Sequence, residues 1–214
     1  MEAQKTVPPF PRDGAKKVQD NDHVFTWDTT LEKGKPTGMY KLDLDQVSVS
    51  LTEGAIKRTR PDGTWAIEQE RLGSVRYDPK GTVLREECIS DTPCHAMVFQ
   101  LKDYVAEPWP TREGIPGQFP RINTVKLFET DRITVWDQVW KPGEVVVRHA
   151  HYHRTVTVFL QGGALRALPD SGVSTPPFTR ELGQVLATVT YNPEAHVEEQ
   201  YSGLPRAIWI EFTK

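Results

Sequence analysis

The chain has 214 residues, of which 37% are hydrophobic and 26% are charged, and its 26 basic and 29 acidic residues give a formal charge of -3. This composition is typical of a folded globular chain with one or two domains and excludes a disordered one. The charge provides no basic surface for phosphates or anionic lipids, so we expect neither a nucleic-acid partner nor a membrane partner. Because Met1–Phe10 lacks the apolar core of a signal peptide, we expect a cytoplasmic protein.

The first 22 residues predict an extended arm, because they contain three prolines among polar residues and no sustained alternation. From Val24 onward, short runs of alternating Val, Thr, Ile and aromatic residues are separated by Gly, Pro, Asp and Asn, as in β-proteins. Residues 47–51, 133–136 and 155–160 are examples. One helical turn is expected at residues 102–106. Many short strands and few helices predict a sandwich or barrel.

The two cysteines, Cys88 and Cys94, lie on either side of the turn residues 91–93. Their spacing is not that of a CxxC metal site, and two cysteines cannot form a disulfide framework. We expect two inert thiols without a function, which oxidation could join in one local bridge.

An internal repeat organises the chain. Trp27-Asp28, followed by Gly34, recurs as Trp136-Asp137, followed by Gly143, about 110 residues later. Four further segment pairs follow in the same order: 51–55 with 159–164, 70–73 with 180–183, 81–87 with 193–199, and 96–99 with 207–210. We interpret this as a duplication. The predicted organisation is an arm (1–22), a first barrel (23–105), a proline-rich linker (106–121) and a second barrel (122–214).

A histidine cluster lies in the second half, at His149, His151 and His153, with His196 further along the chain. Alternation along a strand would direct His149, His151 and also His153 to one face. Closure of a barrel could bring His196 opposite them. Imidazoles that converge in this way can bind a metal ion, whereas a solvated strand face is the structural alternative.

These residues make the sequence resemble the cupin superfamily. Gly143, His149, His151 and Gly162 fall at the spacings of the first cupin motif, with Thr155 in place of its usual Glu. Gly183, His196 and Gln200 take positions of the second motif, whose central P-x-G is absent. The resemblance implies an all-β fold of tandem double-stranded β-helix (jelly-roll cupin) barrels, a bicupin.

The resemblance also implies a mononuclear metal site with His149, His151 and His196 as ligands. A divalent metal is expected, with Fe(II) favoured and Mn(II), Ni(II) or Zn(II) as alternatives. Either Thr155 or His153 would replace the missing Glu ligand. In the first half, the corresponding positions are Tyr40, Leu42 and Leu84, so that barrel is expected to be metal-free and filled by these side chains.

The expected activity is dioxygenase-like chemistry on a small organic acid, with His153 as a base and Tyr191 as a substrate-binding residue at the catalytic site. Glu198 and Glu199 follow His196 and could orient an imidazole, but the pair recurs as Glu86-Glu87, which favours a structural role. Two alternatives remain: a non-catalytic sensor or storage cupin, and a metal-free isomerase whose histidines transfer protons. Because cupins commonly pair through their sheets, we expect a homodimer.

Overall fold

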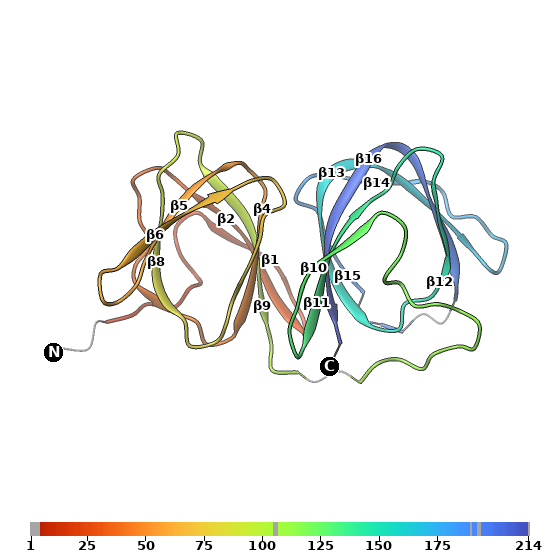
Figure 1. Cartoon of the computed structure of the whole chain (residues 1–214), viewed down its shortest axis with the longest axis horizontal. Helices are drawn as coiled ribbons and strands as arrows, with labels where there is room; N and C mark the ends of the chain where they lie inside the picture. Colours follow the sequence, from red (N-terminus) through yellow and green to blue (C-terminus); the bar gives the residue numbers. More distant parts are fainter. Residues whose placement is uncertain (1–4, 105–106, 189, 192–193, 214) are drawn as a thin grey trace. The chain divides into compact units, whose positions relative to one another are not determined.

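The computed structural model describes residues 5–104, 107–188, 190–191 and 194–213 (Figure 1). The chain divides into two compact units, Met1–Tyr104 and Val105–Lys214. The regular elements of the described residues are all β-strands. Over the same residues there is no helix with the length and apolar character needed to cross a membrane. Because every regular element of the described residues is a strand, the prediction of an all-β jelly-roll barrel fold is confirmed.

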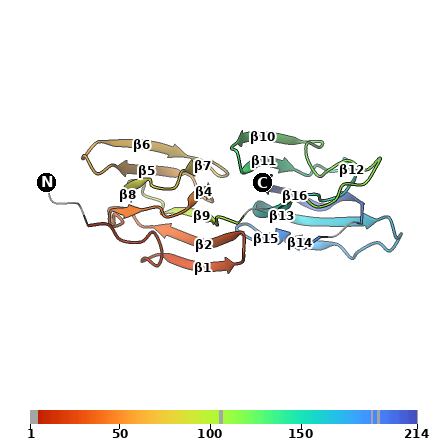
Figure 2. The same cartoon turned by 90° about the horizontal axis from the view of Figure 1, so that it is seen from below.

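The N-terminal unit consists of two antiparallel sheets with its core between them. One sheet has the strand order β1-β2-β9-β4-β7 and the other has the order β3-β8-β5-β6, and Figure 2 shows β1 and β2 in one layer and β5 and β6 in the other. Trp27 and Phe99 are buried in this core. The strands are β1 (Ala15–Asp20), β2 (Val24–Leu31), β3 (Tyr40–Lys41), β4 (Asp45–Ser50), β5 (Gly54–Thr59), β6 (Trp65–Glu70), β7 (Val75–Asp78), β8 (Val83–Cys88) and β9 (Cys94–Leu101).

The C-terminal unit is built around two long strands, β13 and β16, which pair along most of their lengths. The order β10-β11-β16-β13-β14 is extended by β12, which pairs with β16, and by β15, which pairs with β13. Register shifts around Gln161 and Gly163 bend β13, so one strand contributes to two faces of the barrel. The strands are β10 (Thr124–Glu129), β11 (Ile133–Val139), β12 (Val145–His149), β13 (Arg154–Pro169), β14 (Phe178–Arg180), β15 (Val185–Thr188) and β16 (His196–Phe212).

The two units share a pairing pattern. The order β1-β2-β9-β4-β7 of the first unit matches β10-β11-β16-β13-β15 of the second. Tyr40 pairs with Leu84 as His149 pairs with His196, which are the correspondences expected from the repeat.

A further repeat was missed in the sequence. Phe10-Pro11-Arg12 recurs as Phe119-Pro120-Arg121, and both Phe–Pro peptide bonds are cis. The arginine of each copy forms an ion pair with a buried glutamate, Arg12 with Glu86 and Arg121 with Glu198.

Three local expectations differ from the structure. The predicted arm contains β1, which pairs with β2 along Ala15–Asp20 and so forms part of a sheet. The described residues of the predicted linker pack on the C-terminal unit, where the Trp109 amide donates to the Tyr152 carbonyl and Gly117 bridges Ala150. Residues 102–104 are not helical, and the rest of the expected helical turn lies outside the described residues.

The cysteines are joined in a disulfide. Strand β8 ends at Cys88 and β9 begins at Cys94, so the two Cα atoms lie 5.8 Å apart. The expectation of two free thiols is therefore wrong, and the local bridge that oxidation could form is the arrangement found. A short turn between adjacent strand ends brings the sulfurs together.

Candidate metal centre

Strands β12 and β16 bring the three predicted imidazoles together. His149 ends β12 and lies opposite His196, the first residue of β16. The ring centroids of His149 and His196 are 4.5 Å apart, and that of His151 lies 5.4 Å from the first and 5.2 Å from the second. The predicted strand through residue 153 is wrong, because β12 stops at His149 and His151 follows in an irregular segment. The rings nevertheless converge.

Glu198 completes this group, which we call the four-residue cluster: His149, His151, His196 and Glu198. One potential ligand atom from each residue lies within 4.8 Å of the others. Glu198 is two residues after His196 on β16, so strand alternation places both side chains on the same face. The sequence shows this spacing, but the recurrence of the pair as Glu86-Glu87 in the first half favours a structural role when the sequence is taken alone.

Hydrogen bonds orient most of the cluster. His149 Nδ1 lies 2.8 Å from the Val147 carbonyl, which leaves Nε2 directed toward the cluster. The Trp140 indole donates to Glu198 at 3.1 Å, and His196 Nε2 lies 3.4 Å from the other carboxylate oxygen. By contrast, both ring nitrogens of His151 are buried and lack a hydrogen-bond partner among the described residues. Such an imidazole is costly unless a ligand satisfies it.

A buried arginine also contacts the cluster. The Arg121 side chain is 2% exposed, and its Nη1 lies 3.0 Å from His149 Nε2 and 3.2 Å from a Glu198 oxygen. Its Nε donates to Gln138 at 2.8 Å. Aromatic rings surround the guanidinium at 5.0 to 5.6 Å from its central carbon: those of Phe119, Trp140 and Trp209.

The electrostatics keep two imidazoles neutral. Burial lowers the pKa of His149 to about 4 and the pKa of His151 to about 3. Burial alone would also lower the pKa of His196, but the hydrogen bond and charge of Glu198 outweigh it and raise that pKa. The charge of Arg121, opposing burial, holds the pKa of Glu198 well below its usual range. Near neutral pH, His149 and His151 are therefore neutral beside a carboxylate, as a metal ion requires, and an ion bound to His196 would have to displace the proton that Glu198 favours there.

The donor set fits a divalent ion. Three imidazoles and one carboxylate suit Fe(II), Mn(II), Ni(II) and Zn(II), whose bonds to such ligands are about 2.0 to 2.2 Å. Donor atoms within 4.8 Å of one another need only small movements to reach that geometry. The unsatisfied nitrogens of His151 are the observation that most favours a ligand at this position.

The other predicted site residues are not members of the four-residue cluster. His153 lies near Glu211, a buried carboxyl group on β16 whose pKa is raised by burial. Thr155 is buried on β13, and its hydroxyl has no hydrogen-bond partner among the described residues. Tyr191 is exposed, donates to the Pro110 carbonyl and packs on Trp109, and none of these contacts involves the cluster. The catalytic roles of His153 and Tyr191 stay predictions.

The N-terminal unit has a different interior at the equivalent positions. Tyr40, Leu42 and Leu84 are buried together and fill the space that the imidazoles occupy in the other unit. Beside them, Glu86 is paired with three arginines: Arg12, Arg58 and Arg76.

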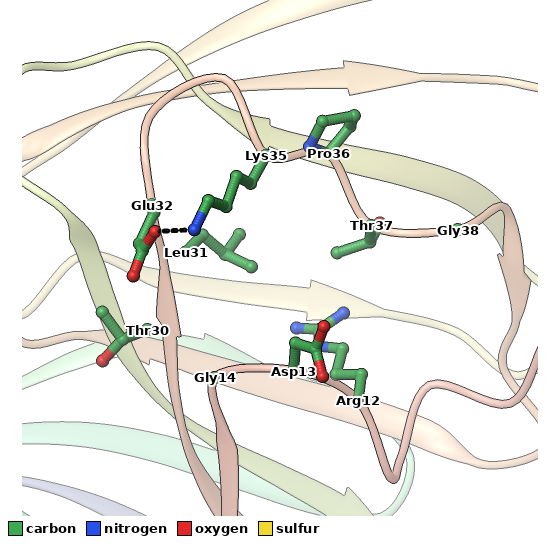
Figure 3. Close-up of a pocket in the computed structure, with 10 residues that line it drawn as sticks. All are labelled: Arg12, Asp13, Gly14, Thr30, Leu31, Glu32, Lys35, Pro36, Thr37 and Gly38. Atoms are coloured by element: carbon green, nitrogen blue, oxygen red, sulfur yellow. Dashed lines mark ion pairs between the residues drawn. The ribbon is translucent and has the colours of Figure 1, made fainter.

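Arg12 also lines a cavity of about 260 Å³ at the N-terminal unit. Figure 3 shows this cavity, in which Lys35 pairs with Glu32 rather than pointing inward as a free cation. The ion pair balances its charge within the wall, so the cavity offers no unpaired lysine to a ligand.

Comparison with known proteins supports the fold. No family model matches the sequence, and no curated protein matches it. Solved structures do match: a cupin 2 conserved barrel domain protein from Leptotrichia buccalis is 12% identical over 93% of this chain and 88% of its own, with a TM-score of 0.57. YhaK from Escherichia coli is 14% identical over 92% and 93%, with a TM-score of 0.61. Oxalate decarboxylase from Bacillus subtilis is 11% identical over 94% and 72%, with a TM-score of 0.62. The chain therefore has the fold of cupin barrel proteins.

Proposed function

We propose that this chain is a bicupin whose C-terminal unit binds one divalent metal ion and acts as an oxidoreductase on a small organic acid. The observation that carries the proposal is the convergence of His149, His151, His196 and Glu198, with both nitrogens of His151 buried and unsatisfied. The matching pairing patterns of the two units support the bicupin part. The Tyr40–Leu84 pair supports a single site per chain, since neither residue offers a metal ligand of the imidazole kind.

The residues of the C-terminal unit have distinct roles in this proposal. His149, His151 and His196 would hold the ion through neutral nitrogens, and Glu198 would be a fourth ligand. Val147 and Trp140 keep His149 and Glu198 in position through the hydrogen bonds described above. Trp140 and Trp209 belong to the apolar core beside the cluster, which limits the access of water. A bound divalent ion would polarise a substrate oxygen and, as Fe(II), supply redox chemistry.

A small anionic substrate suits the charges of this region. The ion would add two positive charges to a region that also holds Arg121, whereas Glu198 contributes one negative charge. The resulting excess of positive charge favours a carboxylate. Oxalate decarboxylase, which shares the fold, takes its name from a small organic acid. The preference for Fe(II) and a dioxygenase-like reaction remains part of this proposal.

Metal analysis and oxygen uptake test the proposal in two stages. Protein purified without chelator should contain about one equivalent of metal per chain, and His151→Ala should remove it. The Fe(II)-loaded protein should then consume oxygen with one class among phenolic, thiol and keto acids. Metal binding without turnover of any of these would favour a sensor or storage protein. Less than about a tenth of an equivalent, with no increase on adding Fe(II), Mn(II) or Zn(II), would contradict the metal site.

A metal-free isomerase is the second candidate, because one pair in the cluster can transfer a proton. His196 lies 3.4 Å from Glu198, whose hydrogen bond and charge raise the pKa of His196 against the effect of burial, so His196 holds a proton more readily than His149 or His151. Chelator-treated protein that kept full isomerase activity on a hydroxy or keto substrate would favour this function. Loss of that activity on chelation would exclude it.

A further inference from the structure

Arg121 places a permanent positive charge against two of the four potential metal ligands. One nitrogen, Nη1, contacts both His149 Nε2 and a Glu198 oxygen. A guanidinium has only donors and no lone pair, so Arg121 cannot itself bind a metal. It occupies the lone pair of His149 Nε2, the nitrogen that an ion would need, and it contacts one of the two oxygens of Glu198. A metal ion and this arrangement of Arg121 therefore exclude each other.

The surroundings hold Arg121 in this place. The side chain is almost fully buried and is enclosed by the three aromatic rings described above. A charge in such an interior requires a nearby counter-charge, and Glu198 provides it. Nη2 remains without a hydrogen-bond partner among the described residues, so the guanidinium is only partly satisfied. Moving the guanidinium away from the cluster would therefore break only the contacts of Nη1 with His149 and Glu198.

We propose that Arg121 is the resident cation of the metal-free site, and that a divalent ion binds by displacing its guanidinium from His149 and Glu198. The inference rests on the proposed metal function and adds a determinant of affinity to it. When no ion is bound, Arg121 balances the negative charge of Glu198. It also lowers the affinity of the site for metal. The metal and the arginine thus act as alternative partners of the same carboxylate.

The N-terminal unit provides a natural control for this exchange. Arg12 occupies the repeated position and lies 3.7 Å from Glu86. The residues equivalent to His149 and His196 are Tyr40 and Leu84, so removing the cation there exposes no set of metal donors. Arg58 and Arg76 also remain paired with Glu86.

The test compares Arg121→Gln, Arg121→Lys and Arg12→Gln in the full-length chain. Zn²⁺ and Mn²⁺ dissociation constants are measured on metal-free protein by equilibrium dialysis at one fixed pH. Thermal midpoints are measured with and without each ion.

Arg121→Gln should bind Zn²⁺ and Mn²⁺ at least 10-fold more tightly than the wild type. Its midpoint should be lower without metal and should recover when Zn²⁺ is added, because the ion replaces the missing charge. Arg12→Gln should change neither affinity nor the effect of Zn²⁺ on the midpoint.

Arg121→Lys covers the case in which the glutamine variant does not fold. Its ammonium keeps the charge but is shorter, so its affinity for Zn²⁺ should lie between those of the wild type and a charge-free site. An unchanged or weaker affinity in a folded Arg121 variant would overturn the inference. If the wild type binds Zn²⁺ through His151 and the variant binds no better, only this inference fails. If neither protein binds Zn²⁺ or Mn²⁺, the proposed metal function fails with it.

Discussion

Among the three histidines of the cluster, His151 is the one whose ring nitrogens have no hydrogen-bond partner among the described residues. Both of these nitrogens are buried, whereas His149 has Val147 and Arg121 as partners and His196 has Glu198. Buried polar groups in this state reduce stability unless a ligand satisfies them. The residue therefore contributes more to ligand binding than to folding in our account.

His151→Ala tests this separation of roles. We expect the substitution to weaken Zn²⁺ binding by at least 100-fold, since it removes one of three imidazoles. The free energy of unfolding of the metal-free protein should change by less than about 2 kcal/mol, because the loss of packing is offset by removal of an unsatisfied ring. Equilibrium dialysis and urea denaturation measure the two effects. Full metal content in the variant would show that the ligand assignment is wrong.

The imidazoles also predict how stability depends on pH. In the unfolded chain each histidine has a pKa near 6.5, whereas in the folded protein the pKa of His149 is about 4 and that of His151 about 3. Below about pH 6.5 the unfolded state therefore binds more protons at these residues, and the folded state loses stability as the pH falls. His196 acts in the opposite direction, because its raised pKa favours the folded state in acid.

The net effect should be a loss of roughly 2 to 4 kcal/mol between pH 7 and pH 4.5 in metal-free protein. Urea denaturation over this range measures it. In His151→Ala the loss should be smaller by about 2 kcal/mol. An identical pH dependence in that variant and the wild type would contradict a neutral, buried His151.

At the scale of the strands, the C-terminal barrel depends on the place where β13 and β16 bend together. Gly163 lies opposite Gly203 in this region. A Cβ atom added to Gly163 would lie 2.6 Å from the Ser202 carbonyl oxygen and 2.6 Å from a Pro205 ring carbon. Backbone atoms cannot move aside as a flexible side chain can, so the bend requires glycine at this position.

Gly163→Ala should therefore destabilise the C-terminal unit by about 1 to 3 kcal/mol, measured as a lower urea midpoint. Gly117→Ala is a suitable control, because its nearest contact would be 3.5 Å from the Tyr152 ring. That substitution should change stability by no more than about 0.5 kcal/mol. Equal effects of the two substitutions would show that the close approach of β13 and β16 does not limit this fold.

The elements also show what could be read from the sequence and what could not. Alternating apolar residues and turn residues predicted a β-barrel, because the burial of one strand face is a local property of the sequence. The histidine spacing likewise predicted that His149, His151 and His196 converge, as they do at the end of β12 and the start of β16. The end of β12 at His149 was not predicted, since it depends on the bridge between Ala150 and Gly117, a contact between distant segments.

Glu198 and Arg121 were not predicted as site residues, because their positions also depend on contacts between distant segments. Glu198 has the right spacing from His196, but its place in the four-residue cluster became evident only when the barrel brought both beside His149 and His151. Arg121 lies in a segment that we expected to be a linker, and nothing local indicates that its side chain is buried. The Phe-Pro-Arg repeat was the signal that could have identified it, through its pairing with a glutamate in each half.

For the molecule as a whole, the two units share a topology but differ in what their interiors hold. The C-terminal cluster consists of potential metal ligands, whereas the N-terminal interior combines Tyr40, Leu42 and Leu84 with an ion-pair network around Glu86. The cytoplasmic location and the homodimer stay predictions. The disulfide between Cys88 and Cys94 is a feature that is more typical of oxidising compartments.

The chain should therefore bind one metal ion rather than two. Titration of the metal-free chain with Zn²⁺ should saturate at about one equivalent, and Leu42→His should not raise this number, because Tyr40 and Leu84 still offer no imidazole. The stoichiometry is measured by dialysis followed by metal analysis. Saturation at two equivalents, with the second lost in an N-terminal variant, would contradict the difference between the units.

A crystal structure of the metal-loaded protein, with anomalous diffraction recorded at the absorption edge of the metal, tests the central claim most directly. We predict one anomalous peak per chain, about 2.0 to 2.2 Å from nitrogens of His149, His151 and His196, with the Arg121 guanidinium moved away from Glu198. The absence of a peak at these imidazoles in fully loaded crystals, or a peak held by other residues, would contradict it.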